Sequence, residues 1–146
     1  MMLAGDIVIA ADTARFCQLE SKRGIAPLGG AHLRYLTRTG WGNAIYHLFL
    51  CDEFGAQEAL RIGFVQEVHP YGKHRERAIE IARGICKCAP LGLRATKTAA
   101  LKYLEQGERA AVEAIPSIEK AVFGSEDFKE GLQSFVERRE ARFQGR

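Results

Sequence analysis

The stretch DIVIAADTARF, residues 6–16, decides the fold class predicted for this chain. Its residues 7–11 are a short apolar run rich in β-branched side chains, which predicts a strand buried on both faces. Only residues 15–18 and 64–68 offer further strands. Because a sheet covered on both faces usually has about five or six strands, the pattern indicates either a small mixed α/β fold or a sheet completed by sequence that lies elsewhere.

The region that follows alternates helices with the strand candidates. A glycine-punctuated loop, GIAPLGG at residues 24–30, opens a helix predicted over residues 31–39, because its proline and glycines favour a tight turn at a helix N-terminus. A Gly-Trp-Gly break separates this helix from a second one over residues 43–51. Apolar spacing also predicts a short helix over residues 57–62. This part of the chain is therefore mixed α and β.

From residue 73 onward the pattern indicates helices only. An apolar stripe predicts a helix that ends near residue 88, and Pro90 is suited to the first turn of the next helix. A helix over residues 109–123 contains Pro116, which we expect to kink or interrupt it. Ser125 is a suitable N-cap for the last helix. We therefore divide the chain into an α/β segment, residues 1–88, and a helical region, residues 89–146.

Composition excludes several classes of protein. The chain has 146 residues, of which 47% are hydrophobic and 27% charged, and this is typical of globular proteins rather than disordered or fibrous ones. The balance of 21 Lys and Arg against 18 Asp and Glu gives a net charge of +3, which is compatible with an anionic small ligand and too small to predict nucleic acid. We expect neither a nucleic-acid partner nor a membrane partner.

Segments of the chain also bear on its compartment. No stretch reaches the roughly 18 apolar residues of a membrane span, and the apolar N-terminus lacks the positive region of a signal peptide. The cysteines form neither a disulfide ladder nor a paired CxxC zinc pattern, which indicates reduced thiols. They are Cys17, Cys51, Cys86 and Cys88. We therefore expect a cytoplasmic protein or one from an organelle matrix.

Glu20 is the sharpest candidate for a catalytic residue. It stands after the short strand and before the glycine loop, whose backbone N–H groups favour negative charge nearby. A carboxylate beside an apolar pocket can have its pKa raised into the range useful for proton transfer. On spacing alone, a surface or helix-capping glutamate is the alternative. The four histidines show no HxxxH or HExxH spacing, so we expect no metal.

Two other segments suggest anion binding. The sequence PLGG at residues 27–30 could hold an anion, but it has neither P-loop nor GxGxxG spacing and a simple connecting loop is the alternative. The sequence FVERREARF at residues 135–143 mixes aromatic side chains with arginines and could hold a phosphate or an adenine. A solvated charged helix face is the alternative there.

Several motifs together resemble the crotonase family of enoyl-CoA hydratases and isomerases. In chain order they are DIVIAADTARF (6–16), QLE (18–20), GIAP (24–27), GG (29–30), AQEALRIGFV (56–65), PLGLRATK (90–97) and EDFKEGLQSFVERR (126–139). The resemblance runs through the whole chain. Because the family's spiral of ββα units begins before such residues, we interpret it as a resemblance to the C-terminal half only. It implies an α/β fold in which residues 1–88 end the spiral core and residues 89–146 form a helical trimerisation region.

The resemblance implies an enzyme, a lyase or isomerase of fatty acid metabolism, that acts on acyl-CoA thioesters through an oxyanion-stabilised enolate. It implies no permanently bound cofactor, with coenzyme A as part of the substrate. Glu20 matches the family's second catalytic glutamate, which moves the proton at the α-carbon. The oxyanion donors and the first glutamate would lie outside this sequence, so we expect this chain alone to be inactive.

The resemblance also implies five substrate-binding residues, namely Pro27, Leu28, Gly29, Phe135 and Arg138. Leu28 falls where hydratases usually have a glycine whose backbone N–H helps to hold water. Phe135 and Arg138 match positions that hold the adenine and phosphate of coenzyme A bound to a neighbouring subunit. The expected partners are therefore an acyl-CoA thioester and further copies of the chain, in a homotrimer or a dimer of trimers.

Departures from the family pattern leave the reaction open. Cys17 and Leu19 stand where Gly and Pro are more frequent around the glutamate, and Leu28 replaces a glycine. Hydration, isomerisation and other crotonase reactions therefore remain alternatives, and the acyl-chain length is undefined. The alternative from another class is a non-catalytic acyl-CoA-binding or oligomerisation module derived from a crotonase.

Overall fold

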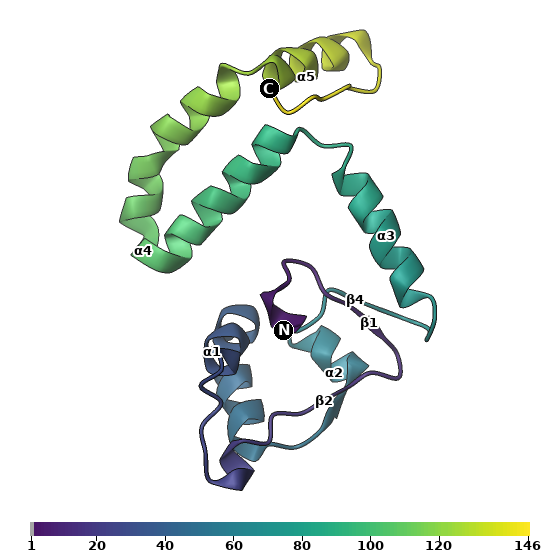
Figure 1. The fold of residues 1–146 in the computed structure, drawn as a ribbon, viewed down its shortest axis with the longest axis vertical. Coiled ribbons are helices and arrows are strands. Elements are labelled where there is room, and N and C mark those ends of the chain that lie inside the picture. Colours follow the sequence, from purple (N-terminus) through teal and green to yellow (C-terminus); the bar gives the residue numbers. More distant parts are fainter. Residues whose placement is uncertain (1) are drawn as a thin grey trace. The chain divides into compact units, whose positions relative to one another are not determined.

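The computed structural model describes residues 2–146 and divides the chain into two compact units, Met1–Glu80 and Ile81–Arg146 (Figure 1). The division falls inside a helix, α3 (His74–Ile85). The first unit contains all the described strands, and the second is helical.

Four short strands form two separate pairs in the first unit. Strand β1 (Ile9–Ala11) pairs in parallel with β4 (Glu67–His69), and β2 (Arg15–Phe16) pairs antiparallel with β3 (Phe54–Gly55). The predicted strands near residues 7–11, 15–18 and 64–68 are thus confirmed. Strand β3 was not predicted, because two residues are too few to show an alternating pattern.

The prediction that the first strand is buried on both faces is wrong. Val8 and Ala10 are buried, whereas Ile7 is 47% exposed. Ile9 and Ala11 are half-buried. The reason is the pleat, which points successive side chains to opposite faces. In a pair of only two strands, one of these faces packs on the core and the other stays open.

Three helices complete the first unit. They are α1 (Ala31–Leu50), α2 (Ala56–Arg61) and α3, with two 3-10 turns, η1 (Met2–Ala4) and η2 (Ser21–Arg23). The predicted break in α1 is confirmed at Gly40, whose φ of 74° and ψ of 167° are not helical. A residue with a side chain adopts such a positive φ only at a cost, so glycine suits this bend.

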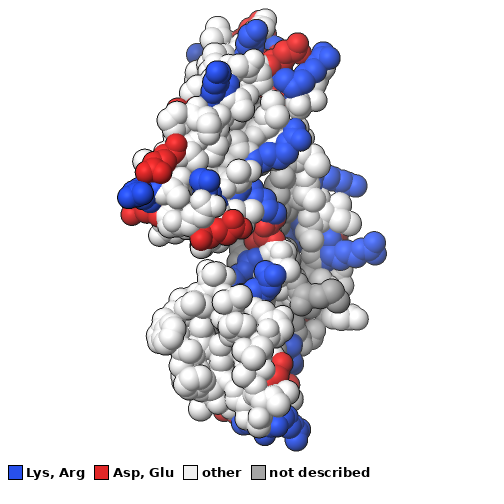
Figure 2. All heavy atoms as spheres, turned by 60° about the vertical axis from the view of Figure 1, so that its left-hand side comes forward, with Lys and Arg blue, Asp and Glu red and all other residues white. Residues whose placement is uncertain are grey.

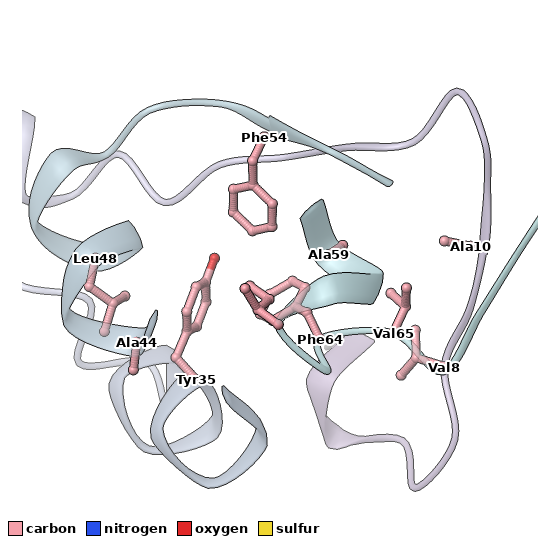
Figure 3. Packing of buried hydrophobic residues seen from close by; sticks show 10 residues of the cluster. Val8, Ala10, Tyr35, Ala44, Leu48, Phe54, Ala59, Phe64 and Val65 are labelled. Carbon is pink, nitrogen blue, oxygen red and sulfur yellow. The ribbon is translucent and has the colours of Figure 1, made fainter. Parts of the chain in front are cut away.

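The core of the first unit is an aromatic cluster between α1, α2 and β3 (Figure 3). The Phe64 ring lies 4.7 Å from the Tyr35 ring, 5.4 Å from Phe16 and 5.5 Å from Phe54, measured between centroids. Such edge-to-face and tilted contacts add to the free energy gained by burying the rings. The cluster fixes Phe16, Tyr35 and Phe64, which also border the candidate site described below.

The second unit contains a long, folded helix and a short one. Helix α4 (Pro90–Phe123) departs from helical angles at Gly107, with φ 82° and ψ 176°, and its two segments lie side by side around a shared apolar hollow (Figure 1). The interruption predicted at Pro116 is wrong. The chain reverses at Gly107 because glycine tolerates this positive φ, and the following segment keeps helical angles through Pro116.

Helix α5 (Glu126–Glu137) begins as predicted. The hydroxyl of Ser125 accepts a hydrogen bond from the backbone N–H of Phe128 at 3.0 Å, so Ser125 is the N-cap. The carboxylate of Asp127 accepts hydrogen bonds from the backbone N–H groups of Gln144 (2.7 Å) and Gly145 (2.8 Å). The C-terminal tail is therefore tied back onto the first turn of α5.

A second carboxylate holds the same tail and makes it sensitive to acid. The guanidinium of Arg139 donates to both oxygens of Glu130, at 2.6 and 2.8 Å, and the backbone N–H of Arg142 donates to Glu130 at 2.7 Å. These hydrogen bonds, with Arg139 contributing most, lower the pKa of Glu130 from its ordinary value of 4.5 to about 2. Since the folded pKa lies below the unfolded one, the stabilisation is complete above the unfolded pKa and is lost as the pH falls through the folded pKa.

We therefore predict that the tail loosens in acid. Amide hydrogen exchange at Arg142 should accelerate as the pH falls from about 4.5 to about 2, after correction for intrinsic exchange. In Glu130→Gln the exchange should be fast throughout, and this pH step should disappear. Exposed Glu105→Gln serves as the control and should keep the wild-type profile. The same pH step in Glu130→Gln would show that another group holds the tail.

Candidate functional site

A hollow of about 430 Å³ in the first unit collects the residues around Glu20. Three segments form most of its wall: η1, the stretch from β2 to Glu20, and the glycine loop with the first turns of α1. The lining residues are Met2, Leu3, Arg15, Phe16, Cys17, Gln18, Glu20, Pro27, Gly29, Gly30, Ala31, Arg34, Tyr35 and Phe64. A single acidic side chain, that of Glu20, is thus set among basic, apolar and glycine residues.

The backbone holds Glu20 in place and leaves its side chain available. Its carbonyl oxygen accepts hydrogen bonds from the N–H groups of Arg23 (2.9 Å) and Ile25 (3.1 Å), and this turn is η2. The side chain is half-buried. Within residues 2–146, no hydrogen bond or ion pair occupies its carboxylate. Glu20 can therefore accept a proton from a ligand without first breaking an internal contact.

The glycine loop brings the N-terminus of α1 to the same hollow. His32 Nδ1 lies 3.0 Å from the carbonyl oxygen of Pro27, so the tautomer with its proton on Nδ1 donates to that oxygen. Gly30 has a φ of 97° and directs the chain into Ala31, the first residue of α1. The unpaired N–H groups of a first helical turn attract negative charge. The hollow therefore favours an anionic or electron-rich ligand.

The predicted site residues fall into two groups. Glu20, Pro27 and Gly29 line the hollow together, whereas Leu28, between the last two, is exposed and its side chain is not part of the wall. Phe135 and Arg138 belong to the second unit, where Phe135 is 83% exposed in α5 and Arg138 ends that helix with a φ of 53°.

Four polar residues of the hollow, namely Arg15, Gln18, Arg34 and Tyr35, were not predicted as site residues. Arg34 and Tyr35 follow Ala31 by three and four positions, and this spacing places all three on one side of α1. That spacing after a glycine loop is the signal that could have identified them. Arg15 reaches the hollow from β2. The exposed guanidinium groups of Arg15 and Arg34 strengthen its attraction for anions.

Tyr35 is the buried polar group of this wall, with only 2% of its surface exposed. Burial, with smaller electrostatic contributions from Cys17, Glu20 and Cys51, raises the pKa of Tyr35 to about 12. The phenol is therefore protonated at neutral pH. The Tyr35 side chain is part of the wall of the hollow that contains Glu20.

Among residues 2–146, no group of three or more His, Cys, Asp or Glu side chains is arranged to hold a metal ion. In the same residues, no helix is both long and apolar enough to cross a membrane.

The fold and the hollow define an α/β protein with an unengaged carboxylate in an anion-attracting site. The sequence model of the family described as Enoyl-CoA hydratase/isomerase matches residues 1–146, so the chain belongs to that family. The solved structure of a probable enoyl-CoA hydratase/isomerase from Mycobacterium abscessus matches 99% of this chain with a TM-score of 0.94 and 47% identity. The fold is thus that of an α/β crotonase with helices.

Curated relatives show the same similarity in sequence. A 2,3-dehydroadipyl-CoA hydratase from Escherichia coli (strain K12) is 31% identical over an alignment of 150 positions, which covers 100% of this chain and 57% of the relative. A short-chain-enoyl-CoA hydratase from Clostridium acetobutylicum is 33% identical over 138 residues, 92% of this chain and 51% of the relative. This chain covers 56% of the chain in the M. abscessus structure. The chain therefore spans about half the length of the relatives it matches.

The interpretation that the resemblance concerns the C-terminal half only is wrong. The family model matches the whole chain from residue 1 to residue 146, and the E. coli relative aligns over all of it. The interpretation depended partly on a first strand that had no evident neighbour. In the structure this strand has a partner within the chain, since β1 pairs with β4 in the register Ile9 to Glu67.

Proposed function

We propose that this chain acts on acyl-CoA thioesters and that Glu20 transfers the proton at the α-carbon, next to the thioester carbonyl. The observation that carries the proposal is the free, half-buried carboxylate of Glu20 in a hollow that also presents a helix N-terminus. The names of the relatives support the substrate class, since both curated hydratases described above are named for CoA thioesters. Coenzyme A is then part of the substrate, and no permanently bound cofactor is required.

The chemistry follows from these groups. The Glu20 carboxylate takes the α-proton, and the electron pair of the broken C–H bond moves to the thioester oxygen, giving an enolate. Backbone N–H groups that donate to this oxygen stabilise its charge, and a single donor of this kind contributes about 3 to 4 kcal/mol. We assign these donors to other parts of the assembled enzyme. Residues 1–146 alone are then slow in catalysis.

The glycine loop favours proton transfer without an added water. The backbone N–H of Leu28, at the position where the family pattern has a water-holding glycine, donates to the carbonyl oxygen of Ala26 at 2.8 Å. That N–H is therefore engaged inside the loop. Isomerisation, in which one carboxylate removes and returns a proton, fits this loop better than hydration does.

The second unit and α1 support self-association. Phe135, Val136 and Leu132 are exposed on α5, and Trp41, Tyr46 and Phe49 are exposed on α1. Figure 2 shows few charged side chains on the face of the first unit that α1 forms. Apolar surface of this extent is typical of interfaces. We propose a homotrimer or a dimer of trimers, in which Phe135 and Arg138 hold the adenine and phosphate of coenzyme A on a neighbouring copy.

The compartment follows from the thiols and the substrate. All four cysteines are free, and three of them are exposed. Free thiols of this kind persist in reducing compartments. We therefore place the activity in the cytoplasm.

Native mass spectrometry of the purified chain, with and without crotonyl-CoA, tests this function. We expect assemblies whose masses are three or six times that of the 16.2 kDa chain, each gaining the mass of bound thioester. Free coenzyme A and acetate, added separately, are the ligand controls. Assemblies that take up no thioester would identify an oligomerisation module instead, and a monomer without ligand would contradict both parts of the proposal.

A further inference from the structure

We propose that the ion pair between Glu130 and Arg139 is a latch that fixes the conformation of Arg138, the arginine to which we assign a phosphate of coenzyme A. Glu130 and Arg139 are then positioning residues for the binding of the thioester, although neither contacts it. This role rests on the proposed function and deepens it, because the latch keeps an exposed arginine at the end of α5 ready for a phosphate before the ligand arrives.

The backbone of Arg138 is strained. It has a left-handed conformation, with φ 53° and ψ 42°, and within residues 2–146 only one other residue apart from glycine has a positive φ. The turn closes the end of α5, because the N–H of Arg138 donates to the carbonyl oxygen of Phe135 (3.3 Å) and that of Arg139 to Ser134 (3.1 Å). A residue with a side chain keeps this conformation where the surrounding structure enforces it. We therefore looked for a contact that holds the turn from its far side.

Glu130 provides this contact. The guanidinium of Arg139 donates to both oxygens of Glu130, at 2.6 and 2.8 Å, and such a two-point pair fixes the orientation of the guanidinium as well as its distance. The Arg139 and Glu130 side chains are 37% and 22% exposed, so solvent screens them less than a fully exposed pair. Glu130 also accepts a hydrogen bond from the N–H of Arg142 at 2.7 Å, and Figure 1 shows the tail running back along α5. The chain on both sides of Arg138 is thus held on this helix.

The latch also determines which arginine is available to a ligand. Arg139 is engaged by carboxylates, and Arg146 forms an ion pair with Glu126 at 2.8 Å. Arg138 is exposed, and within residues 2–146 its guanidinium has no ion pair or hydrogen bond. Phe135, which is 83% exposed, precedes it by three positions. A free cation so close along the chain to an exposed ring is suited to a phosphate and a flat base, and a preorganised group loses little conformational freedom on binding.

Removal of the latch separates positioning from charge. Replacing a carboxylate by an amide makes the tail more positive, so electrostatic attraction alone would tighten the binding of a CoA thioester. Positioning predicts the opposite result. In isothermal titration with crotonyl-CoA, Glu130→Gln should raise the Kd by about 3- to 10-fold, a usual coupling within one ion-pair network. Arg139→Lys should raise it similarly, since lysine keeps the charge and loses the two-point pair.

The matched control is Glu140→Gln. This variant removes an exposed carboxylate from the same tail, where its only ion pair within residues 2–146 is with exposed Lys87, and it leaves the latch intact. Its Kd for crotonyl-CoA should equal the wild-type value or lie slightly below it. Circular dichroism should show the wild-type helix content for all these variants, so that a change in Kd reports on the turn rather than on unfolding.

A double-mutant cycle tests whether the latch acts through Arg138. Arg138→Ala alone should weaken crotonyl-CoA by about 10-fold or more, the usual effect of losing a hydrogen bond between charged groups. In the Arg138→Ala chain, Glu130→Gln should not change the Kd further. A merely structural role of the latch would give the same loss in both backgrounds.

Three results would overturn the latch and leave the proposed proton transfer at Glu20 standing. They are wild-type or tighter binding by Glu130→Gln and Arg139→Lys, wild-type binding by Arg138→Ala, and a full further loss when Glu130→Gln is added to Arg138→Ala. A wild-type chain that does not bind crotonyl-CoA would overturn the latch and the proposed function together.

Discussion

Substitution of glutamine for Glu20 is expected to slow the exchange of the α-protons of butyryl-CoA with D₂O by about 100-fold or more. The glutamine side chain has nearly the same shape as glutamate and cannot accept the proton. The substitution should not disturb the fold, because the Glu20 side chain has no hydrogen bond within residues 2–146 and the turn at this position is held by its backbone carbonyl. Proton NMR of the thioester, followed over many hours, measures the exchange rate even if the chain catalyses the exchange slowly.

A matched variant makes this result interpretable. Glu76→Gln removes an exposed carboxylate in the same unit that lies outside the hollow, and it should keep the wild-type exchange rate. Circular dichroism should show the same helix content for both variants. The assignment of proton transfer to Glu20 is contradicted if the α-protons exchange as fast with Glu20→Gln as with wild type. It is also contradicted if wild type and Glu20→Gln both bind the thioester and neither protein exchanges its α-protons.

The second large effect concerns stability, and it lies in the aromatic core. Phe64→Ala is expected to lower the free energy of unfolding by about 3 to 5 kcal/mol, the usual cost of truncating a buried phenylalanine. Phe64 is 2% exposed, and its ring contacts those of Phe16, Tyr35 and Phe54. Its removal leaves a cavity next to two residues of the hollow, so binding of the thioester should be lost with stability.

Urea unfolding followed by circular dichroism measures this loss. The control is Tyr71→Ala, which truncates an aromatic side chain that is 76% exposed in the same unit and should change the free energy of unfolding by less than about 0.5 kcal/mol. A cost below about 1 kcal/mol for Phe64→Ala would show that the aromatic cluster does not hold the first unit together. An equal cost for Tyr71→Ala would show that the loss of stability is not specific to the buried cluster.

Features with local causes could be predicted from the sequence. The bend at Gly40 follows from glycine's tolerance of a positive φ. The N-cap at Ser125 follows from its hydroxyl, which accepts a hydrogen bond from the backbone N–H of Phe128, three residues later. Glu20, Pro27, Leu28 and Gly29 were assigned with the help of the family resemblance; Glu20, Pro27 and Gly29 do line one hollow, whereas Leu28 does not. Their chemical roles stay predictions.

Features with tertiary causes could not be predicted in this way. Strand β3 exists because Phe54 pairs with Phe16, which is 38 positions earlier, and the partner of β1 is 58 positions away. The place of Tyr35 on the same side of α1 as Ala31 could have been predicted from their spacing, but its ring packs on Phe64, from a distant part of the sequence.

The central claim is that a CoA thioester binds in the hollow beside Glu20, and NMR of the ¹⁵N-labelled chain tests it most directly. On addition of crotonyl-CoA, we expect the largest shifts of backbone amide signals at Glu20, Gly29 and Ala31, with further changes around Tyr35. Free coenzyme A should shift these signals much less. Shifts confined to the second unit, or none at all at saturating thioester, would contradict the assignment of this hollow as the acyl site.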